Sequence, residues 1–185
     1  SKFNTSKVKT MDTMFAWCTS LESVDLSSFN TESVEAFGHP EYCGMFEGCE
    51  SLESLDLSHF NTSSATCLKN MFKGCTSLAT LDISKFNVKN TADMAGMFED
   101  CTSLSYVNVS PNIFVPGAGS TLSANAIITC PELLYDAYNT CEFWNDYYVV
   151  KREPSSGSYI RGDVNNDSDV DVADLFHVAN GIMMF

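Results

Sequence analysis

The sequence has little positive charge and no long hydrophobic run. Among its 185 residues, ten are Lys or Arg and 24 are Asp or Glu, which gives a formal net charge of -14. Nucleic-acid binding requires clustered basic side chains, so this composition argues against a DNA or RNA partner. No apolar stretch approaches the roughly 20 residues of a membrane-spanning helix, so we expect no membrane span in this sequence.

Histidine is also scarce, which bears on catalysis. The three histidines are His39, His59 and His177, and none lies in a pattern that pairs a nucleophile with a base or gathers metal ligands. We therefore expect a protein that is not an enzyme. Hydrophobic residues at 44% and charged residues at 18% are typical of a chain that folds around a core.

What the sequence does contain is a repeat, shown in full between Met45 and Asn61. A Met-Phe pair precedes a cysteine, an apolar triplet of the form Leu-x-x-Leu-x-Leu and a Phe-Asn pair. The cysteines of this column are Cys18, Cys49, Cys75 and Cys101. A period in the twenties with this triplet indicates a leucine-rich-repeat solenoid, because one unit cannot bury its apolar side alone and must stack on its neighbours.

Each unit predicts one strand and a convex segment. The triplet Leu52, Leu55 and Leu57 predicts a short parallel strand with its leucines inward. Its outward residues are then Ser54, Asp56 and Ser58. Between units, apolar residues at spacing three from Ala65 to Met71 predict one or two helical turns on the convex side.

The cysteine column predicts buried thiols rather than disulfides. Equivalent residues of stacked units lie about 4.8 Å apart with parallel Cβ vectors, whereas a disulfide needs converging ones. Cys43 and Cys67 lie off the column in neighbouring units, and a bridge between them stays open. Met14 to Met45 is five residues longer than the other intervals, so residues 38–43 are expected in a surface loop, either a binding feature or a tolerated insertion.

The repeat changes towards residue 150. Thr129-Cys130-Pro131 predicts the start of a helix that ends near Asn139. Aromatic and apolar residues then follow at the spacing of the repeat, and we interpret about 111–150 as a terminal capping unit. These residues are Cys141, Trp144, Tyr147 and Val149.

The motif Met-Phe-x-x-Cys-x-Ser-Leu-x-x-Leu-Asp-Leu-Ser-x-Phe-Asn-Thr resembles the BspA-like leucine-rich repeats of bacterial surface proteins, and the related lipoprotein-associated repeat of unknown function, over residues 1–150. The resemblance implies an extracellular or cell-surface protein that binds partners or mediates adhesion. No initiator Met or signal peptide is present, so we expect a fragment of a longer protein.

A polar linker at residues 151–161 leads to a segment of different chemistry. Residues 162–185 place oxygen-bearing side chains at positions 1, 3, 5, 7, 9 and 12 of a loop, the EF-hand arrangement for calcium. The predicted ligands are Asp163, Asn165, Asp167, Asp169, Asp171 and Asp174. Position 6 is Ser168 rather than Gly, which weakens the expected affinity. The segment resembles the first half of a dockerin, which implies cohesin binding only if the full protein carries a second half.

The outward face of the predicted strands is the candidate for partner binding. Asp25, Asp56 and Asp82 form a column on it, and Tyr106 near one end adds a stacking surface. Ser54 and Ser58 flank Asp56 on the same face. Two interpretations stay open: a cationic or polyhydroxylated partner lies along this column, or the carboxylates are solvated and hydrogen-bonded to neighbouring serines.

We therefore predict an α/β fold, a right-handed leucine-rich-repeat solenoid with short parallel strands, a capping unit and an EF-hand-like half-dockerin appendage. Its predicted function is non-catalytic binding of a host or matrix protein, or of a glycan, through the concave sheet. The alternative is a scaffold component of an extracellular polysaccharide-degrading assembly that is recruited through its dockerin.

Overall fold

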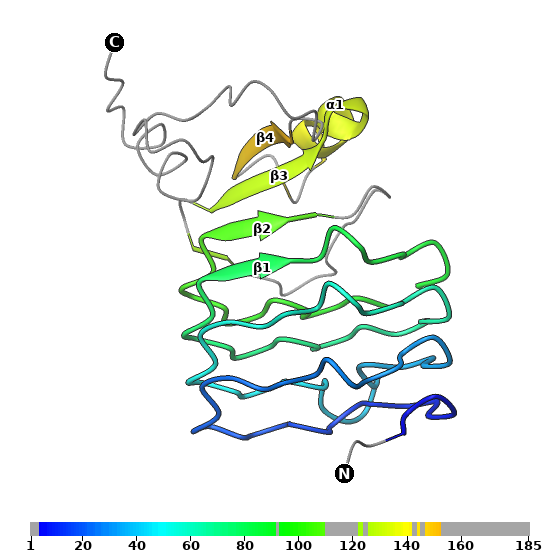
Figure 1. Ribbon diagram of the computed structural model, residues 1–185. Coiled ribbons are helices and arrows are strands. Elements are labelled where there is room, and N and C mark those ends of the chain that lie inside the picture. The colour runs from blue at the N-terminus through cyan, green and yellow to red at the C-terminus, as the bar shows by residue number, and fades with distance from the viewer. Residues whose placement is uncertain are drawn as a thin grey trace.

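The computed structural model describes residues 4–91, 93–109, 122–123, 126–141, 144 and 147–152. In this part of the chain, successive repeats lie one on another, and a four-stranded parallel sheet runs through the later repeats (Figure 1). The strands follow in the order β1-β2-β3-β4, with bounds Thr80–Asp82, Tyr106–Asn108, Ile127–Pro131 and Tyr148–Arg152. A short 3-10 helix η1 (Glu132–Leu134) and helix α1 (Tyr135–Asn139) follow β3. The fold is therefore α/β.

The sheet joins equivalent residues of successive repeats. Thr80 pairs with Tyr106, Tyr106 with Ile127, and Ile127 with Tyr148, in steps of 26, 21 and 21 residues. Strand β3 was not predicted, because Thr129 to Pro131 was interpreted as a helix start. The run Ile127-Ile128-Thr129 is β-branched and buried, which favours a strand, and the 3-10 helix begins only after Pro131.

The strand predicted at residues 52–58 is not regular. Among the backbone hydrogen bonds that join it to the preceding repeat is that from Glu53 N–H to the Glu22 carbonyl, at 3.2 Å, and the continuous ladder begins only at β1. The predicted inward direction of the leucines is nevertheless correct, since Leu52 and Leu57 are buried and Leu55 is half-buried against the core. The apolar spacing therefore predicted the side-chain directions but overstated the regularity of the backbone.

The convex side contains no helical turns among the described residues, so that prediction was wrong. Successive turns replace them, with Ala65 N–H donating to the Thr62 carbonyl at 2.9 Å and Met71 N–H to the Leu68 carbonyl at 3.2 Å. A series of such turns also returns a side chain to one face every three residues, which explains the spacing. Isolated parallel bridges link this side from repeat to repeat through Thr10, Ala36, Cys67 and Asp93.

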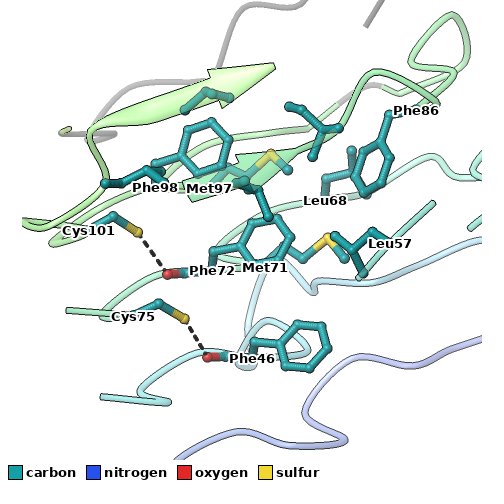
Figure 2. Packing of buried hydrophobic residues seen from close by; sticks show 14 of the residues in the cluster. Phe46, Leu57, Leu68, Met71, Phe72, Cys75, Phe86, Met97, Phe98 and Cys101 are labelled. Atoms are coloured by element: carbon teal, nitrogen blue, oxygen red, sulfur yellow. Dashed lines mark hydrogen bonds between the residues drawn. The ribbon is translucent and has the colours of Figure 1, made fainter. Parts of the chain in front are cut away.

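The core is built from columns of identical residues. Phe15, Phe46, Phe72 and Phe98 stack in sequence, with ring centroids 5.3, 5.9 and 6.0 Å apart and interplanar angles of 15° or less. Methionines at 45, 71 and 97 lie beside these rings and are fully buried. Figure 2 shows Met71, Phe72, Met97 and Phe98 packed together. Identical rings at one repeat spacing give offset stacking along the whole column.

The cysteine column lies next to the phenylalanines. Each buried thiol of this column donates to a carbonyl of the preceding repeat. Cys49 donates to Phe15 at 3.1 Å. Figure 2 shows the next two bonds, from Cys75 to Phe46 at 3.2 Å and from Cys101 to Phe72 at 3.0 Å. Burial is the main cause that raises the pKa of Cys49 to about 11 and that of Cys101 to about 12. The prediction of buried thiols is confirmed for these cysteines.

The prediction of a buried thiol was wrong for Cys18, which is exposed. Its thiol is free, as are those of the other column cysteines. The bridge between Cys43 and Cys67 is not formed, and both thiols are free. The Cys43 sulfur instead accepts a hydrogen bond from the indole of Trp17 at 3.3 Å.

Threonine and asparagine residues at the end of the repeat tie one repeat to the next. The Thr31 hydroxyl donates to the Asn61 carbonyl at 3.1 Å and accepts the Asn61 N–H at 2.7 Å. Thr62 repeats this exchange with Asn87, and Thr5 with Asn30. Each asparagine side chain also accepts the N–H two residues on, as Asn61 does from Ser63 at 3.0 Å. These asparagines and threonines therefore have a structural role.

The C-terminal part of the described chain closes the core with aromatic rings. Trp144 and Tyr138 are fully buried, and their ring centroids lie 6.2 Å apart. Trp144 thus occupies a core position, as its spacing predicted, and helix α1 ends at Asn139 as expected. None of the helices in the described ranges is long and apolar enough to cross a bilayer.

The thiol column predicts a sharp difference in reactivity. Cys18 should be alkylated by iodoacetamide within minutes at pH 8, whereas Cys75 and Cys101 should resist for hours, because they are buried and burial disfavours their thiolates. Mass spectrometry of peptides after timed alkylation measures this difference, with urea-unfolded protein as the control in which all cysteines react. Equal rates for Cys18 and Cys75 in the folded protein would contradict the burial of the Cys75 thiol.

Candidate binding face

The predicted partner-binding residues lie on the outer side of the strand segments. Ser54, Asp56, Ser58, Asp25 and Asp82 are exposed, and Tyr106 is half-buried on β2. We call this surface the sheet face. The register of β1 and β2 places Asp82 directly beside Asn108, and Thr80 beside Tyr106.

The aspartates of the sheet face each close a local turn. Asp25 accepts the backbone N–H of Ser27 at 2.9 Å, Asp56 that of Ser58 at 2.9 Å, and Asp82 that of Ser84 at 2.8 Å. Such turns, in which a carboxylate accepts the N–H two residues on, fix the direction of the side chain. Of the two interpretations, the hydrogen bonding of carboxylates to neighbouring serines is therefore realised, and it does not exclude contact with a partner.

These turns also affect ionisation. Hydrogen bonds from the Ser58 side chain and backbone, with a smaller effect of His59, lower the pKa of Asp56 below its ordinary value of 3.8. A lowered pKa means that the folded state favours the carboxylate, so this contribution to stability is present above the ordinary pKa and is lost as pH falls through the lower one. The Asp56 carboxylate thus stays charged over the whole physiological range.

At the C-terminal end of the sheet face, polar side chains from three strands are joined. The Asn108 amide donates to Asp82 at 3.0 Å, and Thr129 donates its hydroxyl to the Asn108 side-chain oxygen at 3.0 Å. The Tyr106 hydroxyl lies 3.2 Å from the Thr129 hydroxyl. The structure therefore brings together Asp82 and Tyr106, two of the predicted residues, through a network across β1, β2 and β3.

Two tyrosines, Tyr106 and Tyr148, lie at the same end of the sheet on either side of β3. The register places Ile127 between Tyr106 and Tyr148, and Tyr148 is 52% exposed. Thr129 and Ile127, both buried on β3, were missed as neighbours of this face, because their segment was interpreted as a helix start. The β-branched run that they form is the signal that would have revealed them.

The calcium prediction lies outside the described residues. All six predicted ligands, from Asp163 to Asp174, fall in residues 153–185, of which the structure describes none. In the ranges that are described, no cluster of three or more His, Cys, Asp or Glu side chains is arranged to hold a metal ion. The sequence prediction of a calcium loop stays a prediction.

Comparison with known proteins adds one result. The family model described as "Mycoplasma protein of unknown function, DUF285" matches residues 1–40 and 40–110. The chain belongs to the DUF285 family. No curated protein matched the chain in a search, and no solved structure matched it either.

The DUF285 match covers the Met-Phe repeats and ends where β2 has just ended. Asp25, Asp56, Asp82 and Tyr106 therefore lie inside it, and Thr129 and Tyr148 outside it. This family is known in BspA-like surface proteins, which agrees with the resemblance seen in the repeats. The sheet face thus combines DUF285 repeats with the C-terminal segment that follows them.

The network predicts how far Asp82 contributes to stability. Asp82→Ala removes the bonds to Ser84 and Asn108, and should lower the free energy of unfolding by about 1–2 kcal/mol. Asp82→Asn keeps an acceptor for the Ser84 N–H and should cost less than half of that. Urea denaturation followed by circular dichroism measures both values. An alanine variant as stable as the parent would contradict a structural role for these turns.

Proposed function

We propose that this DUF285 chain is a non-catalytic binding module of a bacterial cell-surface or secreted protein, and that a host or matrix protein binds its sheet face. The observation that carries the proposal is the row of exposed carboxylates at Asp25, Asp56 and Asp82, each aimed by its own turn. A set of charges held in fixed directions offers a partner electrostatic complementarity at a low entropic cost.

We also propose that the stacked repeats form a right-handed leucine-rich-repeat solenoid, with residues 111–150 as its cap. Parallel pairing of equivalent residues at Leu81, Val107 and Ile128 supports this architecture, as do the bridges on the opposite side. The aromatic rings of Tyr138 and Trp144 are suited to shielding the last part of a repeat core.

The chemistry of the buried cysteines supports a non-catalytic role. A nucleophilic cysteine needs a lowered pKa, whereas burial raises the pKa of Cys49, Cys75, Cys101 and Cys67. These thiols are donors to backbone carbonyls within the core, and their environment disfavours the thiolate that catalysis would require.

The test of the sheet face is a binding experiment with variants matched in charge. The folded chain is screened against arrays of host and matrix proteins and of glycans, and the affinity for each hit is measured by calorimetry. Asp56→Lys should weaken binding about tenfold or more, since it places a positive charge in the carboxylate row. Glu32→Lys, the same charge change at an exposed position on the turn after Asn30, is the control and should have little effect.

Asp56→Asn separates charge from structure in that experiment. Asparagine can still accept the Ser58 N–H and keep the turn, so a loss of binding in this variant is due to the missing charge. Hits that bind Asp56→Lys as well as the parent would remove the sheet face from the proposal, and hits on glycans alone would replace the protein partner.

The second candidate function, recruitment to an extracellular assembly, depends on the calcium loop. The spacing from Asp163 to Asp174 predicts calcium binding with heat release on titration. Asp163→Ala should abolish the heat, because it removes the first ligand, and Ser168→Gly should tighten binding by relieving the turn at position 6. Isothermal calorimetry of the three proteins measures this, and a heat unaffected by Asp163→Ala would contradict a site in this loop.

A further inference from the structure

Trp17 departs from the pattern of the repeats. Its equivalents in the next three repeats are Gly48, Gly74 and Asp100, and all four positions have a positive φ, at 63°, 73°, 71° and 59°. Glycine adopts this conformation without strain and aspartate tolerates it, but a residue with a bulky side chain pays roughly 1–2 kcal/mol. A tryptophan at this position is therefore a cost to the fold.

A second departure is the insertion at residues 38–43, which occurs in one repeat only among the Met-Phe repeats of the sequence. The residues on either side of it are joined, because Met45 N–H donates to the Phe37 carbonyl at 2.8 Å. Its middle is held by the Lys69 ammonium, which donates to the Pro40 carbonyl at 3.0 Å. At Gly38 a Cβ atom would lie 1.8 Å from the Lys69 carbonyl oxygen, so only glycine fits there. The insertion is thus a loop packed closely on the next repeat.

Trp17 and the insertion are in direct contact. The Trp17 indole N–H donates to the Cys43 sulfur at 3.3 Å, at the end of the insertion. The ring lies against Gly48, where a Cβ atom would come within 2.5 Å of the indole Cε3. Trp17 therefore points towards the next repeat. It is still 60% exposed.

The insertion adds further exposed aromatic surface. Tyr42, next to Cys43, is 61% exposed, and its ring centroid lies 4.4 Å from that of His39. His39 in turn accepts the N–H of Glu41 at its Nδ1 at 3.1 Å, which orients the imidazole. Rigid, exposed Trp and Tyr rings are the side chains that most often dominate binding energy in protein interfaces.

We propose that Trp17, Tyr42 and His39 form a second binding surface, separate from the sheet face, which takes a basic segment of a partner protein. The partner is assigned by charge and by ring chemistry. The chain carries a net charge of -14, and the exposed carboxylate Glu41 lies between the two rings of the insertion in sequence. An indole face is the preferred aromatic partner of an Arg or Lys cation. A partner Arg stacked over the Trp17 ring gives this tryptophan a role in binding, which explains its presence at a position where it strains the backbone.

The decisive variant is Trp17→Gly, which restores the residue found at positions 48 and 74. If Trp17 serves binding, this variant should keep or raise the melting temperature, by up to about 4 °C for the strain relieved, and should lose affinity for the partner. If Trp17 only stabilises the fold, Trp17→Gly should lower the melting temperature and leave the affinity for the partner unchanged. The two roles thus give opposite results.

The probe is a twelve-residue peptide of alternating Arg and Gly, titrated at 0.15 M salt into the full 185-residue chain. The two tryptophans differ in exposure, since Trp144 is fully buried, so changes in quenching by acrylamide report on Trp17. Calorimetry should show affinity about tenfold lower for Trp17→Gly and for Tyr42→Ala than for the parent. Asp136→Asn, an exposed charge change on α1, should leave affinity unchanged.

A peptide with citrulline in place of arginine, which keeps the shape but not the charge, should bind at least tenfold more weakly. Equal binding of the Arg peptide to the parent and to Trp17→Gly would show attraction to the net charge alone and would overturn the proposal. Protection of Trp17 from acrylamide by cellohexaose, without protection by the Arg peptide, would assign the surface to a glycan and overturn it equally. Neither result bears on the sheet face, which Asp56→Lys tests separately.

Discussion

Each repeat of this chain depends on its neighbours because its polar groups find their partners outside the repeat. The clearest case is the exchange between the Thr31 hydroxyl and the backbone of Asn61, which satisfies one donor and one acceptor in a single contact. The Cys75 thiol on the Phe46 carbonyl is a second contact of this type. The adjacent repeat buries these groups, and inside the stack each would cost about 1–3 kcal/mol if it lacked its partner. Burial and hydrogen bonding between neighbouring repeats therefore have to occur together.

This constraint explains why the columns contain the residue types that they do. A residue in a column must pack against the repeat before it and against the repeat after it. The Phe72 ring accordingly lies between those of Phe46 and Phe98 at nearly equal distances. A substitution at one level disturbs two interfaces. The same logic applies to the turns, where a positive φ recurs at Gly48, Gly74 and Asp100 because each repeat must reverse direction at the same point.

The sequence allowed the apolar columns to be predicted, but it did not fully predict the backbone that carries them. The burial of Leu52, Leu57 and Trp144 was predicted correctly, because spacing reports which side of the chain faces the core. Spacing alone could not distinguish a helix from consecutive turns at 65–71, since both return a side chain every three residues. The strand at Ile127 was missed because Pro131 dominated the interpretation of its neighbours, although proline is tolerated at the end of a strand.

The candidate binding face was predictable only as far as the repeat is regular. Asp25, Asp56 and Asp82 recur at fixed positions, so their common direction followed from the pattern, as did the turns that their serines close. The network from Asp82 through Asn108 to Thr129 was not predictable, because it depends on the shortened step to β3.

Residues that follow the repeat and residues that depart from it carry different information about function. The carboxylates of the sheet face serve the fold as well, through their turns, so their presence alone does not require a partner. Trp17 is the reverse case, since its position disfavours tryptophan in the fold and its ring is mostly exposed. Where a repeat departs from its own pattern at a structural cost, and the departure meets an insertion at Cys43, a role outside the fold is the simpler explanation.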